Sequence, residues 1–429
     1  MHPIHSESQP SDESTPLLSE HVDLEAIQKK VPLPTTQLAA LCISRLTDPI
    51  AYSQLFPYIN QMLFDLQVTD DVSKIGFYSG LIESTYAASQ TLTSYAWAKA
   101  SDVLGRRPVV LTCAAGIAVV TLPLGFCTSL TQIIILRALA GCFGANLAVF
   151  HSILGEITHP SHEAIVYPLY SLAWPFGATI GPLSLLYLVF LFAYFYLEET
   201  LPSKRPGVTT DGVNPQSPPL GATDLLSIPM IRVLAVSFFA LSFNYIAFDV
   251  VTEIGYSLAT SAVILAILQL CFMPTLLRTY RASTIYHTSM CCWPLTFFLI
   301  PFLHVIARAG YNADTGAVNL EANVMVWSGI ALVLTCSHIP VLAYTTNTIL
   351  VRKHSPCPLS FGACNGLMQV AECVSRMLSP AFISSVFAFS VGNDLLGGYP
   401  VWVVVMLSVS SVTCFFSRKL VTMDKDVEV

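Results

Sequence analysis

The chain has 429 residues, of which 54% are hydrophobic and 11% charged, and its mean hydropathy is +0.63. A soluble core cannot use so many apolar residues, so this composition excludes a soluble globular protein and predicts a polytopic protein of the lipid bilayer. The net charge of −7 and the pI of about 5.8 leave no basic excess, which argues against a nucleic-acid partner.

Residues 1–37 are rich in serine, proline and acidic residues and are predicted to form a disordered cytoplasmic tail. Within this tail, Glu13 and the pair Leu17-Leu18 are spaced as in an acidic dileucine sorting signal, although a chance match explains so short a pattern equally well. The first apolar run begins near Leu38, so no cleavable signal peptide is expected.

An N-terminal helical bundle is predicted over residues 38–197, with its first four spans at about 38–63, 75–98, 108–127 and 130–154. A charged run interrupts the apolar sequence between the second and third spans; it contains Lys99, Asp102, Gly105, Arg106 and Arg107. Cations in short loops mark the cytoplasmic side. This preference for cations on the cytoplasmic side explains the arginines, but it does not explain why Asp102 and Gly105 occur at this spacing.

The segment 164–197 has no polar loop and is too short for two full spans of about 20 residues and a turn. Two crossings nevertheless leave only Lys74 and Arg308 in outer loops, as the positive-inside rule requires. We therefore predict spans 5 and 6 here, with part of the outer loop and of the adjoining helix ends absent.

Residues 198–229 are rich in proline and glycine and are predicted to form a cytoplasmic linker. A C-terminal helical bundle is expected over 230–416, followed by a cytoplasmic tail, 417–429. Its spans are predicted at about 230–251, 254–277, 286–307, 324–346, 361–389 and 398–416. Only Thr252 and Glu253 separate spans 7 and 8, so this outer loop is shortened as well.

Ionisable residues at membrane depth cost about 3 kcal/mol or more and are functional candidates by default. The candidates singled out within the expected spans are Asp48, Glu83, Arg137, His338, Glu372 and Arg376, with Asp249 near an outer end. Glu372 and Arg376 are four residues apart on one helix, so a structural ion pair is the favoured interpretation. Asp48 lies beside Arg45, and snorkelling to the inner surface explains it as well as function does.

Four runs resemble signatures of the major facilitator superfamily. One is the run from Leu41 to Ile50 in the first span, which contains Arg45 and Asp48. In the charged run, Ser101, Asp102, Gly105, Arg106 and Arg107 match the family pattern, whereas Ala98 and Val103 depart from it. Arg137 followed by Gly141 and Gly144 resembles a fourth-helix signature. Gly177, Gly181 and Pro182 resemble the fifth-helix motif of proton-driven antiporters, although Leu183 to Leu186 replace its later glycine pair. The chain is similar to the 12-helix drug:proton antiporters, particularly the fungal and plant zinc-induced-facilitator-like group.

This resemblance implies an all-α membrane protein of two six-helix bundles that rock around a central site. It implies that Arg137 faces a carboxylate of the first or second helix, either Glu83 or Asp48. It also implies that Asp102 helps to latch the two halves in the outward-facing state.

Glu83 is the favoured carboxylate for proton coupling. Burial favours the neutral form of a carboxyl group and a nearby cation favours the charged form, so the approach and retreat of Arg137 would load and release a proton. A structural role, with Glu83 hydrogen-bonded to neighbours such as Thr85, has equal weight. Asn244, Tyr245 and Gln369 are the candidate cargo contacts, among other aromatic and amide residues for which packing is the more frequent role.

We predict a monomeric secondary transporter that exports a small organic molecule, a drug or secondary metabolite, against protons. It would act in the plasma membrane or in a vacuolar or endosomal membrane. No nucleophile, base and orienter fall together, so no enzyme is expected. No cofactor is expected either, and Pro160 breaks the helical spacing of a metal motif at His159 and His162. The alternative is a shortened isoform that serves as a non-translocating membrane sensor or scaffold.

Overall fold

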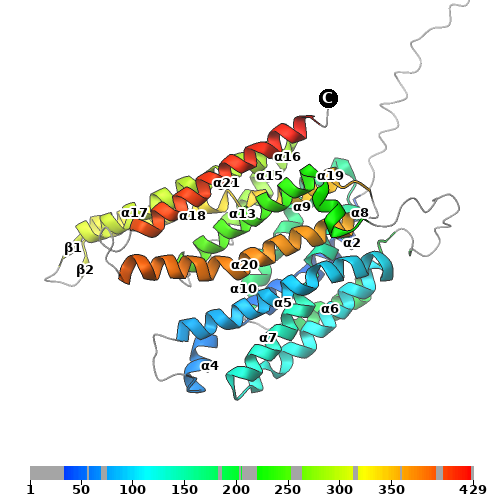
Figure 1. Cartoon of the computed structure of the whole chain (residues 1–429), viewed down its shortest axis with the longest axis horizontal. Helices are drawn as coiled ribbons and strands as arrows, with labels where there is room; N and C mark the ends of the chain where they lie inside the picture. Colours follow the sequence, from blue (N-terminus) through cyan, green and yellow to red (C-terminus); the bar gives the residue numbers. More distant parts are fainter. Residues whose placement is uncertain are drawn as a thin grey trace, which may run out of the picture. The chain divides into compact units, whose positions relative to one another are not determined.

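A computed structural model describes the chain over residues 33–55, 58–68, 75–181, 186–201, 204, 220–252, 263–312, 317–357, 360–392 and 400–426 (Figure 1). One compact unit, Thr35–Val429, contains nearly all of these residues. The expected dileucine signal lies outside them.

The N-terminal half is built almost entirely from helices. They are α2 (Thr35–Arg45), α3 (Thr47–Ser53), α4 (Ile59–Asp65), α5 (Ile75–Leu104), α6 (Arg106–Thr121), α7 (Leu130–Gly144), α8 (Leu147–Ile157), α9 (Glu163–Ser171), α10 (Ala173–Ile180) and α11 (Leu186–Tyr196), with the short turns η2 (Leu122–Phe126) and η3 (Pro160–His162). The first predicted span is broken at Leu46, because Pro49 lacks the N–H that would bond to the Arg45 carbonyl.

The C-terminal half is helical too. Its elements are α12 (Ala222–Ser227), α13 (Pro229–Thr252), η6 (Leu268–Phe272), α15 (Met273–Thr279), α16 (Ala282–Met290), α17 (Cys292–Ala309), α18 (Leu320–His338), α19 (Leu342–His354), α20 (Phe361–Gly392) and α21 (Pro400–Asp426). A two-residue hairpin, β1 (Tyr311–Asn312) with β2 (Ala317–Val318), joins α17 to α18. The all-α prediction is confirmed, since this hairpin is the only strand pairing in the described residues.

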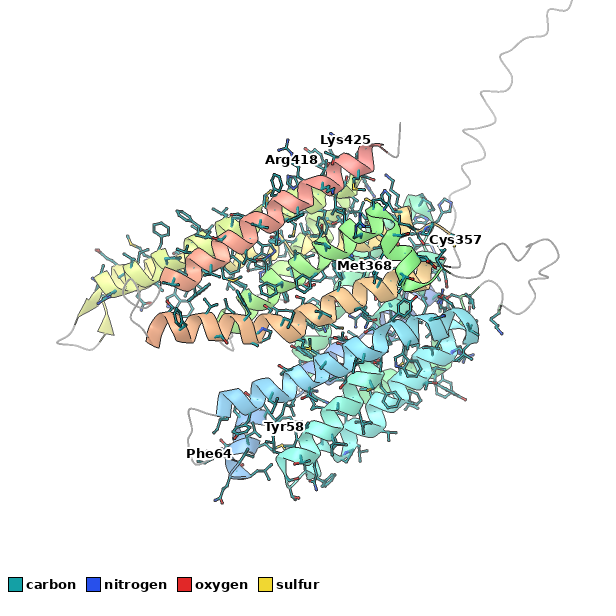
Figure 2. The ribbon with its side chains drawn as sticks, in the orientation of Figure 1. Tyr58, Phe64, Cys357, Met368, Arg418 and Lys425 are labelled. Carbon is teal, nitrogen blue, oxygen red and sulfur yellow. The ribbon has the colours of Figure 1, made fainter. Side chains whose placement is uncertain are left out.

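Five runs of the described helices are long and apolar enough to cross a membrane. They are Arg106–Phe126, Leu130–Ile157, Pro229–Phe248, Glu321–His354 and Val401–Lys425, and the shorter Val263–Thr279 is also apolar. The helices α5 and α20 are as long, but they carry Glu83, Glu372 and Arg376 and line the interior. In Figure 2, Lys425 and Cys357 lie toward one end of the helices, whereas Tyr58 and Phe64 lie toward the other. We call the first the basic end; it is the expected cytoplasmic end.

The two ends of the segment 164–197 lie at the same end of the helices, as the expected double crossing requires. Glu163 pairs with Arg352, and Glu199 accepts the backbone N–H of Arg106 at 2.8 Å, so the chain leaves and returns at the basic end. The returning helix, α11, has only 11 residues, a length of about 16 Å against a hydrocarbon core of about 30 Å. This agrees with the predicted shortening; the corresponding loop of the second half, 253–262, lies outside the described residues.

Two predicted boundaries differ from the structure. The helix α21 continues through Asp426, where a tail was expected from residue 417, because Leu420 is fully buried and Asp424 accepts hydrogen bonds from Ser283 and Lys353. The end of the predicted linker also contains α12, whose Leu225 packs into the C-terminal core.

Candidate functional site

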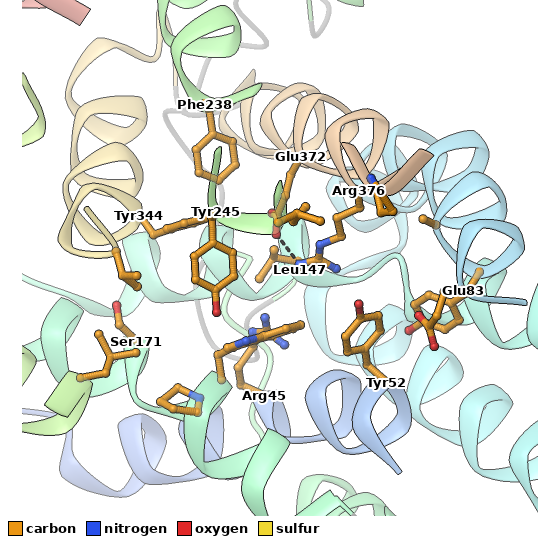
Figure 3. A pocket seen from close by; sticks show the side chains of 18 of the residues that line it. Arg45, Tyr52, Glu83, Leu147, Ser171, Phe238, Tyr245, Tyr344, Glu372 and Arg376 are labelled. Carbon is orange, nitrogen blue, oxygen red and sulfur yellow. Dashed lines mark hydrogen bonds and ion pairs between the residues drawn. The ribbon is translucent and has the colours of Figure 1, made fainter. Parts of the chain in front are cut away.

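A cavity of about 420 Å³ lies between the two halves, within the range of small-molecule sites. Figure 3 shows Arg45, Tyr52 and Glu83 of the N-terminal half facing it, and Tyr245 and Arg376 of the C-terminal half lie opposite. Its other aromatic walls are Tyr86, Tyr167, Tyr170, Trp174, Phe238 and Tyr344. Such a lining suits an aromatic or amphipathic organic molecule.

Glu83 and Arg137 form an ion pair at the cavity wall. Arg137 Nη2 donates to Glu83 Oε1 at 2.8 Å, and Nη1 donates to the carbonyl oxygen of Ala51 at 3.2 Å. The guanidinium lies over the ring of Tyr86, 4.7 Å from its centroid. The Glu83 side chain is 25% exposed toward the cavity, whereas that of Arg137 is 2% exposed. Of the two candidate partners for Arg137, the structure selects Glu83.

Asp48 takes a different partner. Its carboxylate accepts from Arg45 at 3.4 Å and from the Tyr86 hydroxyl at 2.9 Å, and the residue is buried rather than snorkelling. Tyr86 therefore links Asp48 to the Glu83–Arg137 ion pair. Its hydroxyl donates to Asp48, and its ring lies under the Arg137 guanidinium. Thr85 is not a partner of Glu83, since its hydroxyl donates to the Leu81 carbonyl of its own helix.

Glu372 and Arg376 form the ion pair expected on α20. Beyond this pair, the Arg376 guanidinium lies 5.0 Å from the Trp174 ring and 5.9 Å from that of Tyr52. Both rings belong to the N-terminal half, so Arg376 bridges the halves within the cavity. The second carboxylate oxygen of Glu372 is buried and has no hydrogen-bond partner among the described residues.

Of the three candidate cargo contacts, only Tyr245 lines the cavity. Asn244 faces α21. Its Nδ2 donates to Thr413 Oγ1 of α21 at 3.1 Å and to the Ala240 carbonyl of its own helix at 2.8 Å. Gln369 accepts the backbone N–H of Ala148 at 3.0 Å and joins α20 to α8. In this structure the amides of Asn244 and Gln369 are used in helix packing and do not line the cavity, so their role in cargo binding stays a prediction.

The glycines of the antiporter-like motif lie at a helix contact. A Cβ on Gly177 would meet the ring of Pro49, and one on Gly181 would meet the Ser53 hydroxyl. These glycines let α10 pack closely against α3. Pro182 lies outside the described residues.

The charged run between α5 and α6 forms a hydrogen-bonded network at the basic end. Arg106 Nη1 donates to Asp102 Oδ1 at 2.6 Å, and its Nε and Nη2 donate to Glu156 Oε1 at 3.0 and 2.9 Å. Glu199 accepts the backbone N–H groups of Arg106 and Arg107 at 2.8 and 3.1 Å. Gly105 has φ +110°, and a side chain there would also collide with the Glu199 carboxylate.

Asp102 also faces the start of α20. A Cβ on Gly362 would collide with its carboxylate, so only glycine permits this approach. The free N–H groups and positive dipole at a helix N-terminus favour a carboxylate there. Burial raises the pKa of Asp102, and the charge of Arg106 opposes that rise.

Further contacts tie the halves together near this end. The Arg352 guanidinium donates to Glu163 at 2.7 Å and to the Thr158 carbonyl at 2.6 Å, and Asn365 donates to Ser152 at 3.2 Å. Because these bonds join α19 and α20 to α8 and α9, the basic end of the interface is closed in this structure.

Glu156, Glu199, Gly362 and Gly366 were missed by the sequence reasoning. The Gly362-x-x-x-Gly366 spacing was the available signal, since small residues four apart allow close helix contact. Gly366 packs against Ala98 of α5. Nothing in the local sequence singles out Glu156 and Glu199, which acquire their role only when the end of α8 and the segment after α11 meet the start of α6.

Residues 41–380 match the model of the Major Facilitator Superfamily. The chain is 30% identical to the major facilitator-type transporter psiT2 of Psilocybe cyanescens, with all of both chains covered. That alignment runs over 528 positions, more than the 429 residues of this chain, so the relative carries segments that have no counterpart here.

Partial matches include the efflux pump azaK of Aspergillus niger, 35% identical over 40% of this chain and 38% of that protein. ZINC INDUCED FACILITATOR 1 of Arabidopsis thaliana is 29% identical over 35% of this chain and 31% of that protein. Among solved structures, the human organic anion transporter MFSD10 (TETRAN) superposes with a TM-score of 0.69 over 90% of this chain and 100% of that chain, at 17% identity. At that identity the likeness shows the fold alone.

Proposed function

The chain belongs to the major facilitator superfamily and is a membrane transporter, and we propose that it exports a small organic molecule in exchange for protons. The efflux pump among its relatives and the aromatic cavity between the halves support export of an organic cargo. Export would take place as a monomer in the plasma membrane or in a vacuolar or endosomal membrane.

The Glu83–Arg137 pair is the observation that carries proton coupling. One carboxylate oxygen of Glu83 binds Arg137, while the other is buried without a hydrogen-bond partner in the described part of the chain. A proton taken up at that oxygen would remove the negative charge of Glu83 and weaken its bond to Arg137, whose other contacts are the Ala51 carbonyl and the Tyr86 ring. Proton occupancy would thereby change how tightly α5, α7 and α3 are held together, as coupling to a conformational change requires.

Transport of ethidium, a fluorescent aromatic cation, into inside-out vesicles tests the proposal. Uptake should require an acidic vesicle interior and should collapse when nigericin dissipates the pH gradient. In Glu83→Gln the gradient should no longer accelerate uptake, although the cavity still binds the probe. Thr85→Ala, two residues away, is the matched control and should behave as the wild type. Gradient-dependent uptake by Glu83→Gln would refute the coupling assignment.

The short α11 favours a second candidate, a sensor or scaffold that does not translocate. Its 11 residues do not span a bilayer core, and the relative psiT2 has additional segments. Folded protein that binds ethidium in the cavity but shows no uptake under any gradient would support this candidate.

A further inference from the structure

A cluster of metal-ligating side chains lies outside the cavity, between α16 and α21. His287 lies on α16, Cys291 follows the end of that helix, and Cys414 lies on α21. Their ligand atoms all lie within 4.8 Å of one another. Cys291 is exposed, whereas His287 and Cys414 are partly buried.

Hydrogen bonds fix the protonation of the histidine ring. The Ser417 hydroxyl donates to the Cys414 carbonyl at 2.7 Å, so its oxygen accepts from His287 Nδ1, which lies 2.7 Å away. Nδ1 then carries the proton, and Nε2 presents its lone pair toward Cys291 Sγ at 3.9 Å. A hydrogen bond at the other ring nitrogen is the feature that orients metal-binding histidines.

The two sulfurs lie closer together than two thiolates bound to one zinc ion. Cys291 Sγ and Cys414 Sγ lie 2.6 Å apart, and both cysteines are free. Zinc–sulfur bonds of about 2.3 Å would hold two thiolates about 3.8 Å apart. Because Cys291 is exposed, rotation of its side chain can open this separation.

We propose that His287, Cys291 and Cys414 bind one thiophilic transition-metal ion, with Zn²⁺ as the reference ion, and that this ion ties α16 to α21. Two thiolates and one imidazole form a ligand set of zinc, and the fourth position remains open to water. Each thiol releases its proton on binding. This site is separate from the cavity and does not depend on the proposed transport.

The position of the cluster favours reduced thiols. Arg281 precedes α16, and Arg418 follows Cys414 by one turn of α21, where Figure 2 shows it near the basic end. The sequence places these cations on the cytoplasmic side, where cellular thiols keep cysteines reduced. The spacing of His287 and Cys291, four residues apart, was the available sequence signal, whereas Cys414 comes from a helix far away in the chain.

Cobalt titration of the reduced, full-length protein in detergent tests the proposal. Wild type should bind one Co²⁺ per chain with a thiolate-to-cobalt charge-transfer band, and one equivalent of Zn²⁺ should displace it. Cys291→Ser and Cys414→Ser should lose the band, whereas Cys271→Ser, at an exposed cysteine of η6, should keep it. Ser417→Ala should keep the spectrum but weaken the affinity by about 10- to 100-fold, because the hydrogen bond that orients His287 is lost.

Monodisperse elution and an unchanged unfolding temperature without metal would show that each variant is folded. If Cys414→Ser does not fold, the proposal is tested with Cys291→Ser alone, because the Cys291 side chain is exposed and its replacement should not disturb packing. Reduced wild type without the band, or a band that survives in Cys291→Ser, would overturn the proposal. So would recovery of the pair as a Cys291–Cys414 disulfide that binds no metal after reduction.

Discussion

The two halves of the molecule bury their charges differently. In the N-terminal half, Arg137 of α7 pairs with Glu83 of α5 and binds the Ala51 carbonyl of α3, so one cation joins three helices. In the C-terminal half, Glu372 and Arg376 pair along one helix. Asp424 also joins α21 to α16 and α19 in that half, but at the basic end and away from the cavity. Next to the cavity helices, the aromatic side chains of Trp293, Phe297, Trp402 and Phe248 pack against one another.

The difference suggests that the two ion pairs at the cavity have different roles. A charge that joins several helices of one bundle responds to protonation by loosening that bundle. A charge that pairs on its own helix is free to reach outward, and Arg376 does so over Trp174 and Tyr52 of the other half. We therefore expect the first pair to matter for stability and coupling, and the second for the contact between the halves.

The largest effect is expected from Arg137→Leu. This change leaves Glu83 without its cation in a mostly buried position, and breaking a buried pair costs about 3–5 kcal/mol. The loss should appear as a lowered free energy of unfolding of the protein in detergent. The matched variant Arg376→Leu should lose less, because its ion pair lies along one helix, whereas Arg137 also binds the Ala51 carbonyl of α3. Equal losses in the two variants would remove the distinction between the halves.

A smaller effect is expected at the basic end, where both halves contribute. Asp102→Asn removes the ion pair with Arg106 and the charge facing the N-terminus of α20. Helix-terminus interactions of this kind contribute about 0.3–2 kcal/mol, so ethidium turnover should fall by up to about 30-fold with unchanged probe binding. Gly362→Ala places a methyl group against the same carboxylate from the other half and should act in the same direction.

Val103→Ala is the control for this pair, because Val103 lies on the same turn and is 62% exposed. It should leave turnover unchanged. Wild-type turnover in Asp102→Asn would show that the network around Arg106 stabilises the fold without taking part in the conformational change.

Much of the architecture follows from sequence patterns, and the reasons are physical. The length and apolar content of the spans, and the bias of cations to one side, predicted both the all-α fold and the double crossing after Glu163. The i,i+4 spacing likewise predicted the Glu372–Arg376 pair. These features depend on neighbours along one helix, which the sequence displays directly.

Contacts between helices were harder to predict. The choice between Glu83 and Asp48 as partner of Arg137 depends on the rotation of three helices, and sequence spacing does not encode it. The same is true of Asn244, whose amide turns toward Thr413 rather than the cavity. Glu156 and Glu199 reach Arg106 only because the end of α8 and the segment after α11 converge on the start of α6.

The smallest effects are expected from substitutions of two adjacent residues of α13, Tyr245 and Asn244. Tyr245 lines the cavity with its ring 6.0 Å from that of Tyr344, whereas Asn244 is fully buried against α21. Tyr245→Ala should therefore weaken ethidium binding, measured by fluorescence titration, because aromatic contacts of this kind contribute about 0.5–1.5 kcal/mol. Asn244→Ala should leave that affinity unchanged and lower the free energy of unfolding by about 1 kcal/mol, since its hydrogen bonds to Ala240 and Thr413 are lost. Weaker probe binding in Asn244→Ala, at unchanged stability, would mean that α13 presents its other face to the cargo.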